Sequence, residues 1–325
     1  HLECAVGNPR QNQLWKYIAV IVISFIAATT IGAIPMLIAA VIKAMEYKDD
    51  LLSATEAIQQ IIASDLMSGN LGLALLLFSS IVALFALIFF FKPLHNRTIK
   101  QVINGTGRIR WNRFWMGIVA WGIIMALYLI IDRSIDPANY TFQFDITSFI
   151  PLVFITLIMM PFQTTYEELA FRGYLAQGIA AYTRNRWLVV IIPGVLFGLI
   201  HFLNPEVEEH GFWLMMPQYI FFGLFFGLIT VLDDGIELAM GVHAINNIFI
   251  SLFTTNSSSV FQTPAVFSVG EVEPLKELVV LVVSALLVLA FFYKKYKWNF
   301  SILNQRIEQT ANEDVEDRQR LETFE

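Results

Sequence analysis

Residues 71–91 read LGLALLLFSSIVALFALIFFF and contain no charged side chain. Roughly 20 consecutive apolar residues are enough for a helix to cross the hydrocarbon core of a bilayer. The same bias extends along the chain, since 56% of its 325 residues are hydrophobic and 15% are charged, against roughly 25% charged in an average soluble domain. This composition excludes a soluble globular protein, a disordered chain and, with Cys4 as the single cysteine, a disulfide-stapled domain. We therefore predict an all-α, polytopic membrane helix bundle.

Apolar segments near spanning length recur along the chain and predict about eight transmembrane helices. The first is long, and Pro35 is expected to kink it. We expect an N-terminal tail over residues 1–13, either native or added by cloning because no Met begins the chain, then a transmembrane bundle over 14–298 and a cytoplasmic tail over 299–325. The predicted spans are 14–45, 71–91, 115–131, 149–171, 187–203, 213–232, 238–253 and 278–293.

Charged residues in the connecting segments alternate in sign and predict the orientation of the bundle. Cytoplasmic loops of membrane proteins are enriched in Lys and Arg. The basic segments are 92–113, 184–186 and 294–297, so we predict that these segments and both termini are cytoplasmic. The acidic pair Asp233–Asp234 is an exception on this side. The alternate, acidic loops contain Asp49, Asp50, Glu56, Asp132, Asp136, Asp145, Glu206, Glu208, Glu209, Glu271 and Glu273.

Ionisable side chains inside predicted spans are expensive in lipid and usually have a functional or a pairing reason. Glu168 and Arg172 are four residues apart, so they share one helix face and are expected to pair. Glu167 points about 100° away from Glu168 and can meet a different helix. His243 and Asn247 also share a face. The polar residues are Glu167, Glu168 and Arg172 at the end of the fourth span, His201 in the fifth, and His243 and Asn247 in the seventh.

These three helices could bring one free carboxylate, two imidazoles and one carboxamide to a small volume, and this set suits hydrolysis. A glutamate in a partly desolvated pocket can take a proton from water. Imidazole and amide donors can stabilise a developing oxyanion by about 3–4 kcal/mol per good donor. Because no Ser or Cys in these segments lies beside a base, water is the predicted nucleophile. Gln163 and Tyr166 are expected to support Glu167 from nearby.

Structural explanations of the same residues stay open. The two glutamates can form a helix-end acidic pair that answers Arg172 and Arg184, and the other polar residues can hydrogen-bond between helices. The Phe-rich segment 221–227 is expected to face lipid and to make small-residue contacts. The predicted bounds also put His201 about 21 Å from the inner end of its helix, whereas Glu167 lies near the cytoplasmic side.

Three ordered motifs carry a resemblance to a known family. They are Glu167-Glu168-x-x-x-Arg172, Phe197-x-x-x-His201 and His243-x-x-x-Asn247, each within a predicted span. In this order they resemble the motifs of the CAAX-protease and bacteriocin-processing (CPBP, or Abi) intramembrane endopeptidases, over about residues 149–253. The resemblance implies a bundle of mostly eight helices whose active site lies inside the membrane and opens towards the cytosol. The implied roles are general base for Glu167, a shared hold on the catalytic water for His201, oxyanion stabilisation for His243 and Asn247, and organisation of the motif helix for Glu168 and Arg172.

The function predicted from the sequence is hydrolysis of a peptide bond in a lipidated or membrane-associated peptide or protein. No cofactor is expected, although zinc bound by Glu167, His201 and His243 stays open as an alternative. Two other functions stay open: an ion-coupled transporter that uses the buried Glu and His residues as a relay, and a catalytically silent membrane scaffold. The net charge of −6 without a long basic stripe predicts no nucleic-acid partner, whereas membrane lipid is an expected partner.

Overall fold

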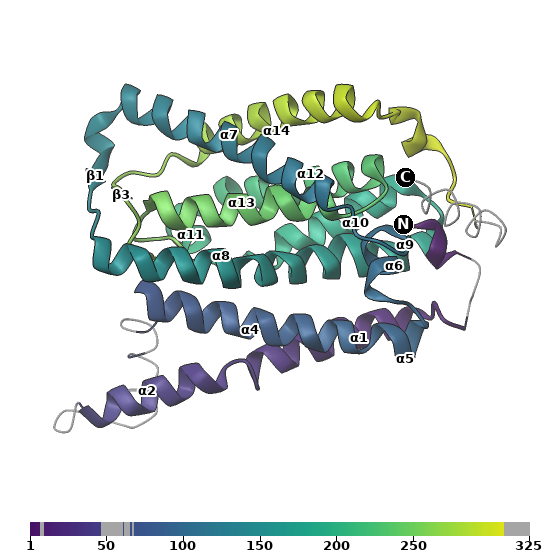
Figure 1. The fold of residues 1–325 in the computed structure, drawn as a ribbon, viewed down its shortest axis with the longest axis horizontal. Helices are drawn as coiled ribbons and strands as arrows, with labels where there is room; N and C mark the ends of the chain where they lie inside the picture. The colour runs from purple at the N-terminus through teal and green to yellow at the C-terminus, as the bar shows by residue number, and fades with distance from the viewer. Residues whose placement is uncertain (7–9, 47–60, 62–65, 67, 309–325) are drawn as a thin grey trace.

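The computed structural model describes residues 1–6, 10–46, 61, 66 and 68–308, and these parts form a helix bundle with one small sheet (Figure 1). The predicted all-α membrane fold is therefore confirmed. Six described segments are long and apolar enough to cross a membrane, and Arg186–Leu199 and Glu237–Phe253 are shorter apolar helices. Together they follow the order of the predicted spans. The acidic residues Asp49, Asp50 and Glu56 and the segment 309–325 lie outside the described residues.

The helices pack side by side and run between two ends of the bundle (Figure 1). They are α1 (Leu14–Thr29), α2 (Ile34–Glu46), α4 (Gly69–Phe89), α5 (Phe91–His95), α6 (Ile99–Asn104), α7 (Trp111–Ile135), α8 (Ile146–Glu168), α9 (Ala176–Thr183), α10 (Arg186–Leu199), α11 (Pro205–His210), α12 (Phe212–Asp233), α13 (Glu237–Phe253) and α14 (Pro274–Tyr296), with the shorter turns η1 (Glu3–Ala5), η3 (Pro137–Asn139), η4 (Leu169–Leu175) and η5 (Phe300–Asn304). The main contacts join α1 to α4, α4 to α8, α8 to α13, α13 to α7, α10 to α12 and α12 to α14.

The fourth span is longer than the sequence predicts. Helix α8 continues through the π-helical turn η4 into α9, so one helical segment covers Ile146–Thr183. The prediction ended this span at residue 171, directly before Arg172, but the side chain of Arg172 is 1% exposed and paired inside the bundle. Glu167 therefore lies about as far from the end of this segment as His201 lies from the start of α10. The predicted mismatch in depth between these two residues is thereby corrected.

The first span is interrupted between α1 and α2, at residues 30–33. Pro35 lies in the first turn of α2, where its fixed φ and missing N–H are tolerated, so the break comes just before the proline rather than at it. Gly32 lies in the break, and its carbonyl accepts a hydrogen bond of 3.1 Å from the Ser79 hydroxyl of α4. The interrupted span is thereby attached to the bundle.

Side-chain caps fix the starts of the two helices that lead to Glu167 and His201. The carboxylate of Asp145 accepts hydrogen bonds from the Thr147 hydroxyl at 2.6 Å and from the Ser148 backbone N–H at 3.0 Å, at the start of α8. These donors favour the charged form and lower the pKa of Asp145 to about 2. Asn185 caps α10 by accepting from the backbone N–H groups of residues 187 and 188 at 2.9 and 3.2 Å.

A small sheet joins the loops at one end of the bundle. Its strands β1 (Tyr140–Phe142), β3 (Phe267–Val269) and β2 (Thr254–Thr255) lie in the order β1-β3-β2. Strand β3 pairs antiparallel with β1 and parallel with β2. We call this end, with the loops 136–145, 204–211 and 254–273, the acidic end, because it carries the acidic loop residues of the described chain.

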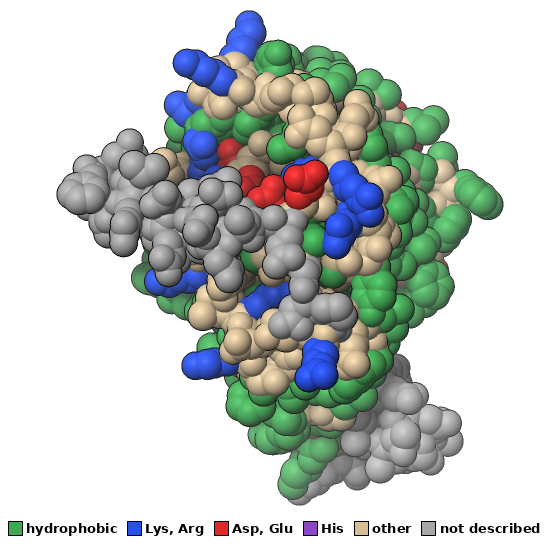
Figure 2. Space-filling model, turned by 90° about the vertical axis from the view of Figure 1, so that its right-hand side faces the viewer, with side chains coloured by type: hydrophobic (Ala, Val, Ile, Leu, Met, Phe, Trp, Pro, Cys, Tyr) green, Lys and Arg blue, Asp and Glu red, His purple; other side chains and the backbone are tan. Residues whose placement is uncertain are grey.

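The opposite end, which we call the basic end, contains the segments 92–113, 184–186 and 294–297. Figure 2 shows Lys and Arg side chains spread over this face. The acidic pair that was the exception here is compensated, since Asp233 lies 3.2 Å from both Arg110 and Arg113. Burial opposes the charge of Arg110, but the carboxylates of Glu237 and Asp233 outweigh it and raise the pKa of Arg110. The net character of this end remains basic.

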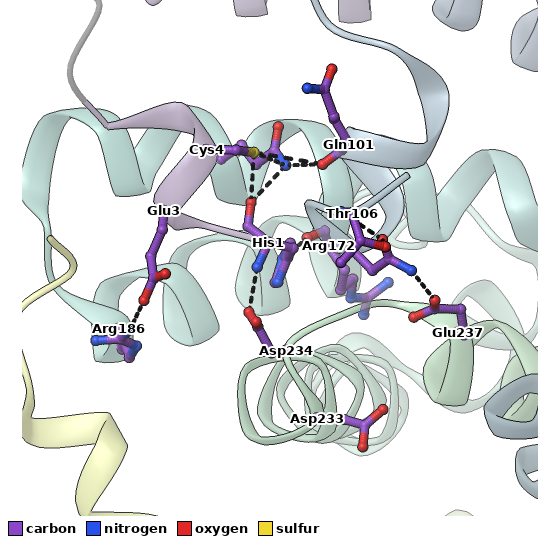
Figure 3. Close-up of polar contacts among 12 residues, drawn as sticks. His1, Glu3, Cys4, Gln101, Thr106, Arg172, Arg186, Asp233, Asp234 and Glu237 are labelled. Carbon is purple, nitrogen blue, oxygen red and sulfur yellow. Dashed lines mark hydrogen bonds and ion pairs between the residues drawn. The ribbon is translucent and has the colours of Figure 1, made fainter. Parts of the chain in front are cut away.

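Both described terminal segments pack against the basic end. Leu2 and Ala5 are 3% and 0% exposed, and Glu3 pairs with Arg186 at 3.3 Å (Figure 3). After α14, Leu303 and Ile307 are 3% and 0% exposed. The described residues of the two predicted tails are thus part of the bundle surface at this end.

The closest helix contact near the motifs joins α10 and α12. A Cβ atom on Gly223 would lie 2.0 Å from the carbonyl oxygen of Gly194, so only glycine fits at this crossing. The small-residue contacts expected for segment 221–227 are therefore present. The expectation that this segment faces lipid is wrong for Phe225 and Phe226, which are 4% and 1% exposed.

Gly223→Ala is expected to destabilise the bundle, because the new methyl group must push α10 away from α12. Overpacking of this kind typically costs about 1–3 kcal/mol. The measurement is thermal unfolding of the purified protein in detergent. Gly107→Ala is the matched control, since no heavy atom lies within 4 Å of a Cβ built there. Equal melting temperatures for the two variants would show that the crossing is not close.

Candidate active site

The three sequence motifs meet in the interior of the bundle. Four of their residues line one cavity of about 570 Å³, namely Glu167, His201, His243 and Asn247. The other two, Glu168 and Arg172, lie directly behind the cavity wall, fully buried. The residues come from the end of α8, the turn η4, the segment after α10 and the middle of α13. Every motif residue predicted from the sequence is thus part of one site.

Glu168 is the centre of a buried network of charges. Its Oε1 atom accepts hydrogen bonds from Arg172 at 3.0 Å and from Nδ1 of His243 at 2.8 Å. The expected pair between Glu168 and Arg172 is therefore observed. Arg172 also donates to the carbonyl of Gly223 at 3.1 Å, and its guanidinium lies 4.1 Å from the centre of the Phe197 ring. The network links α8, η4, α12 and α13 through one charged cluster.

Glu167 differs from its neighbour because its carboxylate reaches the cavity. Its side chain is 16% exposed, whereas that of Glu168 is 0% exposed. One oxygen, Oε1, accepts a hydrogen bond of 2.5 Å from Gln163, and the other, Oε2, lies 3.5 Å from Nε2 of His243. His243 therefore stands between the two carboxylates and contacts Glu168 with one ring nitrogen and Glu167 with the other.

A chain of side-chain donors orients Glu167 and Asn247. The Trp121 indole donates to Asn246 at 3.1 Å, Asn246 donates to Asn247 at 3.1 Å, Asn247 donates to Gln163 at 3.2 Å, and Gln163 donates to Glu167. The same Asn247 nitrogen lies 3.4 Å from Nε2 of His243. Since an amide nitrogen carries two N–H groups, Asn247 keeps one donor beyond the one given to Gln163. This relay rigidly fixes the wall of the cavity.

His201 is held by a different set of contacts. Its Nδ1 donates to the carbonyl of Phe197 at 2.7 Å, which leaves Nε2 of the neutral ring as an acceptor. The ring stacks on Tyr219 of α12, with centroids 4.6 Å apart and an interplanar angle of 15°. The Tyr219 hydroxyl in turn accepts from Asn204 at 3.1 Å. His201 is thus held in place by the backbone carbonyl of Phe197 and by the stacked ring of Tyr219.

Several site residues were missed or misplaced by the sequence analysis. Tyr219, Trp121 and Asn246 were not singled out. The available signals were the position of Tyr219 within an apolar helix and the position of Asn246 directly before Asn247 in the third motif. Gln163 supports Glu167 as expected. Tyr166 does not, because its hydroxyl lies 3.2 Å from that of Ser24 on α1, and it is absent from the described cavity lining.

The zinc alternative stays a prediction. His243 and Glu167 approach each other to 3.5 Å, but one nitrogen of His243 is already bound to Glu168, and one nitrogen of His201 is bound to a backbone carbonyl. Among the residues that the structure describes, no group of three or more His, Cys, Asp or Glu side chains has a geometry that could hold a metal ion. The chemistry available to the described side chains themselves is proton transfer and hydrogen bonding.

The cavity extends from the motif residues to the acidic end. Its described lining there includes Asp132, Asn139, Tyr140, Glu206, Glu271, Glu273, Lys276 and Glu277. None of the described lining residues comes from the basic segments 92–113, 184–186 and 294–297. The resemblance implied a cytosolic opening, and the charge rule placed the basic segments in the cytoplasm. The described lining thus extends away from the basic segments, and the side of the membrane to which the cavity opens stays a prediction.

Arg172→Met should strongly destabilise the protein, because it leaves the fully buried Glu168 without its cation. Removal of one partner from a buried ion pair typically costs about 3–5 kcal/mol. The control is Lys294→Met at the exposed basic end, where surface substitutions usually change stability by less than about 0.5 kcal/mol. The readout is thermal unfolding in detergent, and a melting temperature of Arg172→Met as high as that of Lys294→Met would contradict the network.

Comparisons with known proteins agree with the motifs. The family described as type II CAAX prenyl endopeptidase Rce1-like matches residues 147–249. The uncharacterized protein YyaK of Bacillus subtilis (strain 168) is 36% identical over 183 residues, which cover 56% of this chain and 61% of the relative. No solved structure matches the chain. The matched family segment contains all of the motif residues that meet at the cavity. The resemblance to the CAAX-protease and bacteriocin-processing family is therefore confirmed, and residues 147–249 are the part of the chain that carries it.

Proposed function

We propose that this chain is an intramembrane endopeptidase that hydrolyses a peptide bond with water activated by Glu167. The observation that carries the proposal is the unequal environment of two adjacent glutamates. Glu168 is buried and bound by Arg172 and His243, so it is committed to structure. Glu167 reaches the cavity beside His243 and His201, where it can act on a water molecule. The Rce1-like match over this segment supports the same chemistry.

In the first step, a water molecule in the cavity is held between Glu167 and the free Nε2 acceptor of His201. Glu167 takes one proton from this water as a general base, and the water oxygen attacks the carbonyl carbon of the peptide bond. The hydrogen bond from Gln163 orients the carboxylate without neutralising it. A water nucleophile needs no covalent intermediate with the protein.

In the second step, the oxyanion that forms on the peptide carbonyl is stabilised from α13. Asn247 supplies an amide N–H, and His243 supplies Nε2–H when both of its ring nitrogens are protonated. The Glu168 carboxylate accepts from Nδ1 and fixes the orientation of the ring. The C–N bond then breaks, and the Glu167 carboxylic acid returns its proton to the leaving amine. The atoms balance, with one water consumed for each bond cleaved.

The proposed substrate is a lipidated or membrane-associated peptide. The cavity lies inside a helix bundle of membrane-spanning length, and its lining combines the polar motif residues with apolar side chains such as Leu76, Phe222 and Ile250. A peptide that is anchored in the bilayer can present an extended segment to such a cavity without leaving the membrane. The family description names prenyl endopeptidases, which act on substrates of this class.

Glu167→Gln is expected to abolish cleavage of a quenched fluorogenic, membrane-anchored peptide by purified protein. The amide keeps the shape of the side chain but cannot take a proton, and general-base catalysis contributes about 10²–10⁴-fold. Glu209→Gln is the matched control, since Glu209 is an exposed acid outside the described cavity lining. His201→Ala should also lose activity while its melting temperature stays near that of the parent.

Two results would contradict the proposal. Cleavage by Glu167→Gln within a few-fold of the parent would remove the mechanism. A folded parent that cleaves no peptide would favour the catalytically silent scaffold, and loss of ion-coupled uptake in liposomes by Glu167→Gln would favour the transporter.

A further inference from the structure

A chain of side-chain hydrogen bonds runs from α7 through α13 to the cavity glutamate on α8. It begins at the Trp121 indole and ends at the Glu167 carboxylate, and the amides of Asn246, Asn247 and Gln163 lie between them. The successive donor–acceptor distances are 3.1, 3.1, 3.2 and 2.5 Å. Because turning an amide over exchanges its donor and its acceptor, the direction of this chain decides which group Asn247 presents to the cavity.

Trp121 sets the direction of the chain at the α7 end. An indole nitrogen can only donate, so the Asn246 atom that faces it is the carbonyl oxygen, and the Asn246 amino group faces Asn247. The carbonyl oxygen of Asn247 therefore accepts, and its amino group donates to Gln163. At the other end, an ionised Glu167 can only accept, which requires the same direction. The two ends of the chain thus agree.

The direction of the chain matters for the oxyanion. In the observed direction, the amino group of Asn247 lies 3.4 Å from Nε2 of His243 and keeps one N–H beyond the one given to Gln163. In the reverse direction, the Asn247 carbonyl oxygen would take this place and repel a developing negative charge. We propose that Trp121 is a positioning residue for the hydrolysis, because its indole N–H fixes the amide chain so that Asn247 presents an N–H to the oxyanion. The inference rests on the proposed function for the role of Asn247, whereas the hydrogen bonds of the chain can be measured without cleavage.

The packing around Trp121 suits this role. Its side chain is 2% exposed, and its ring centroid lies 5.7 Å from that of Phe225 and 6.0 Å from that of Phe222 on α12. The helices α7 and α13 also approach each other closely, since a Cβ atom on Gly241 would lie 2.1 Å from the carbonyl oxygen of Phe114. The backbones that carry the indole and its amide partner are therefore held together by direct contact between the two helices.

Trp121→Phe keeps an aromatic ring against Phe222 and Phe225 and removes the indole N–H. With purified protein and the quenched, membrane-anchored peptide, kcat should fall about tenfold while KM stays within about twofold, since outright loss of an oxyanion donor costs about 10²–10³-fold. Trp187→Phe is the matched control, because it removes an indole hydrogen bond of 2.9 Å to Asn304 outside the described cavity lining. An unchanged kcat for folded Trp121→Phe protein, or a change in KM alone, would overturn the proposal.

The direction of the chain is tested at Asn246, whose side chain is half-buried. Asn246→Asp still accepts from Trp121 but cannot donate to Asn247, so the Asn247 amide should turn its amino group to the new carboxylate and its carbonyl oxygen to the cavity. Asn246→Leu has nearly the same size and offers neither a donor nor an acceptor. We expect kcat to fall about 10²–10³-fold in Asn246→Asp and about tenfold in Asn246→Leu. Equal losses, or a larger loss in Asn246→Leu, would contradict the proposed direction.

A double variant tests whether Trp121 acts through Asn247. Asn247→Ala alone removes the oxyanion donor, so the orientation that Trp121 imposes has nothing left to act on. Adding Trp121→Phe to Asn247→Ala should therefore lower kcat no further, as is typical of residues that belong to one hydrogen-bonded network. Losses that multiply in the double variant would show that Trp121 acts by another route and would remove its positioning role.

The chain is also measured without cleavage, by nuclear magnetic resonance of protein with isotope-labelled tryptophan in detergent. The indole N–H signal that disappears in Trp121→Phe belongs to Trp121. This signal should move in Asn246→Leu and, by less, in Gln163→Leu, because hydrogen bonds in a chain polarise one another. Trp187→Phe should leave it in place, and a signal that stays at the parent position in Asn246→Leu would overturn the inference. If the folded parent cleaves no peptide, the proposed function fails, and this signal alone decides whether Trp121 directs the amide chain.

Discussion

The buried contact among Glu168, Arg172 and His243 is the constraint on which the rest of the structure depends. Charges in a bilayer are stable only when each has a partner, and here one carboxylate serves both an arginine and a histidine. Because these residues come from α8, η4 and α13, the requirement to pair them fixes how those helices are rotated and how deep they lie. Arg172 extends the constraint to α12 through the carbonyl of Gly223, at the position where α10 approaches most closely.

The sequence predicted the parts of the site that depend on local geometry. The pair of Glu168 and Arg172 follows from a spacing of four residues, and the helical character of each motif follows from hydropathy. The depth of Glu167 could not be predicted, because a charged residue such as Arg172 normally marks the end of a membrane span. The span was therefore predicted to end just after Glu167, and only the structure shows that Arg172 is buried. Within the long segment Ile146–Thr183 the charge of Arg172 is compensated by Glu168 of the same segment, and the Gly223 carbonyl of α12 accepts a further hydrogen bond from it.

Contacts between residues of different helices could not be predicted from the sequence either, because they depend on how the helices pack. Phe226 stacks on His243 with centroids 5.1 Å apart, whereas Phe212 of the same helix is 40% exposed, and the pattern of 28 Phe residues does not distinguish them. The stacking of Tyr219 on His201 likewise joins residues of different helices. The open end of the cavity depends on which helix ends are spread apart and which are packed, and motif spacing contains no information on this point.

Glu167 and Glu168 are adjacent and chemically identical, but they have different surroundings because they point in different directions around the helix. Glu168 faces the protein interior and holds both Arg172 and His243 with its Oε1 atom, so its carboxylate is committed to these two partners. Glu167, about 100° further around the helix, meets the cavity with one oxygen bound by Gln163 and the other near His243. In the proposed mechanism, a single glutamate could not both fix the histidine and accept a proton from water. The doubled glutamate separates these requirements, and His243 couples them, since the same ring is anchored by one carboxylate and presented beside the other.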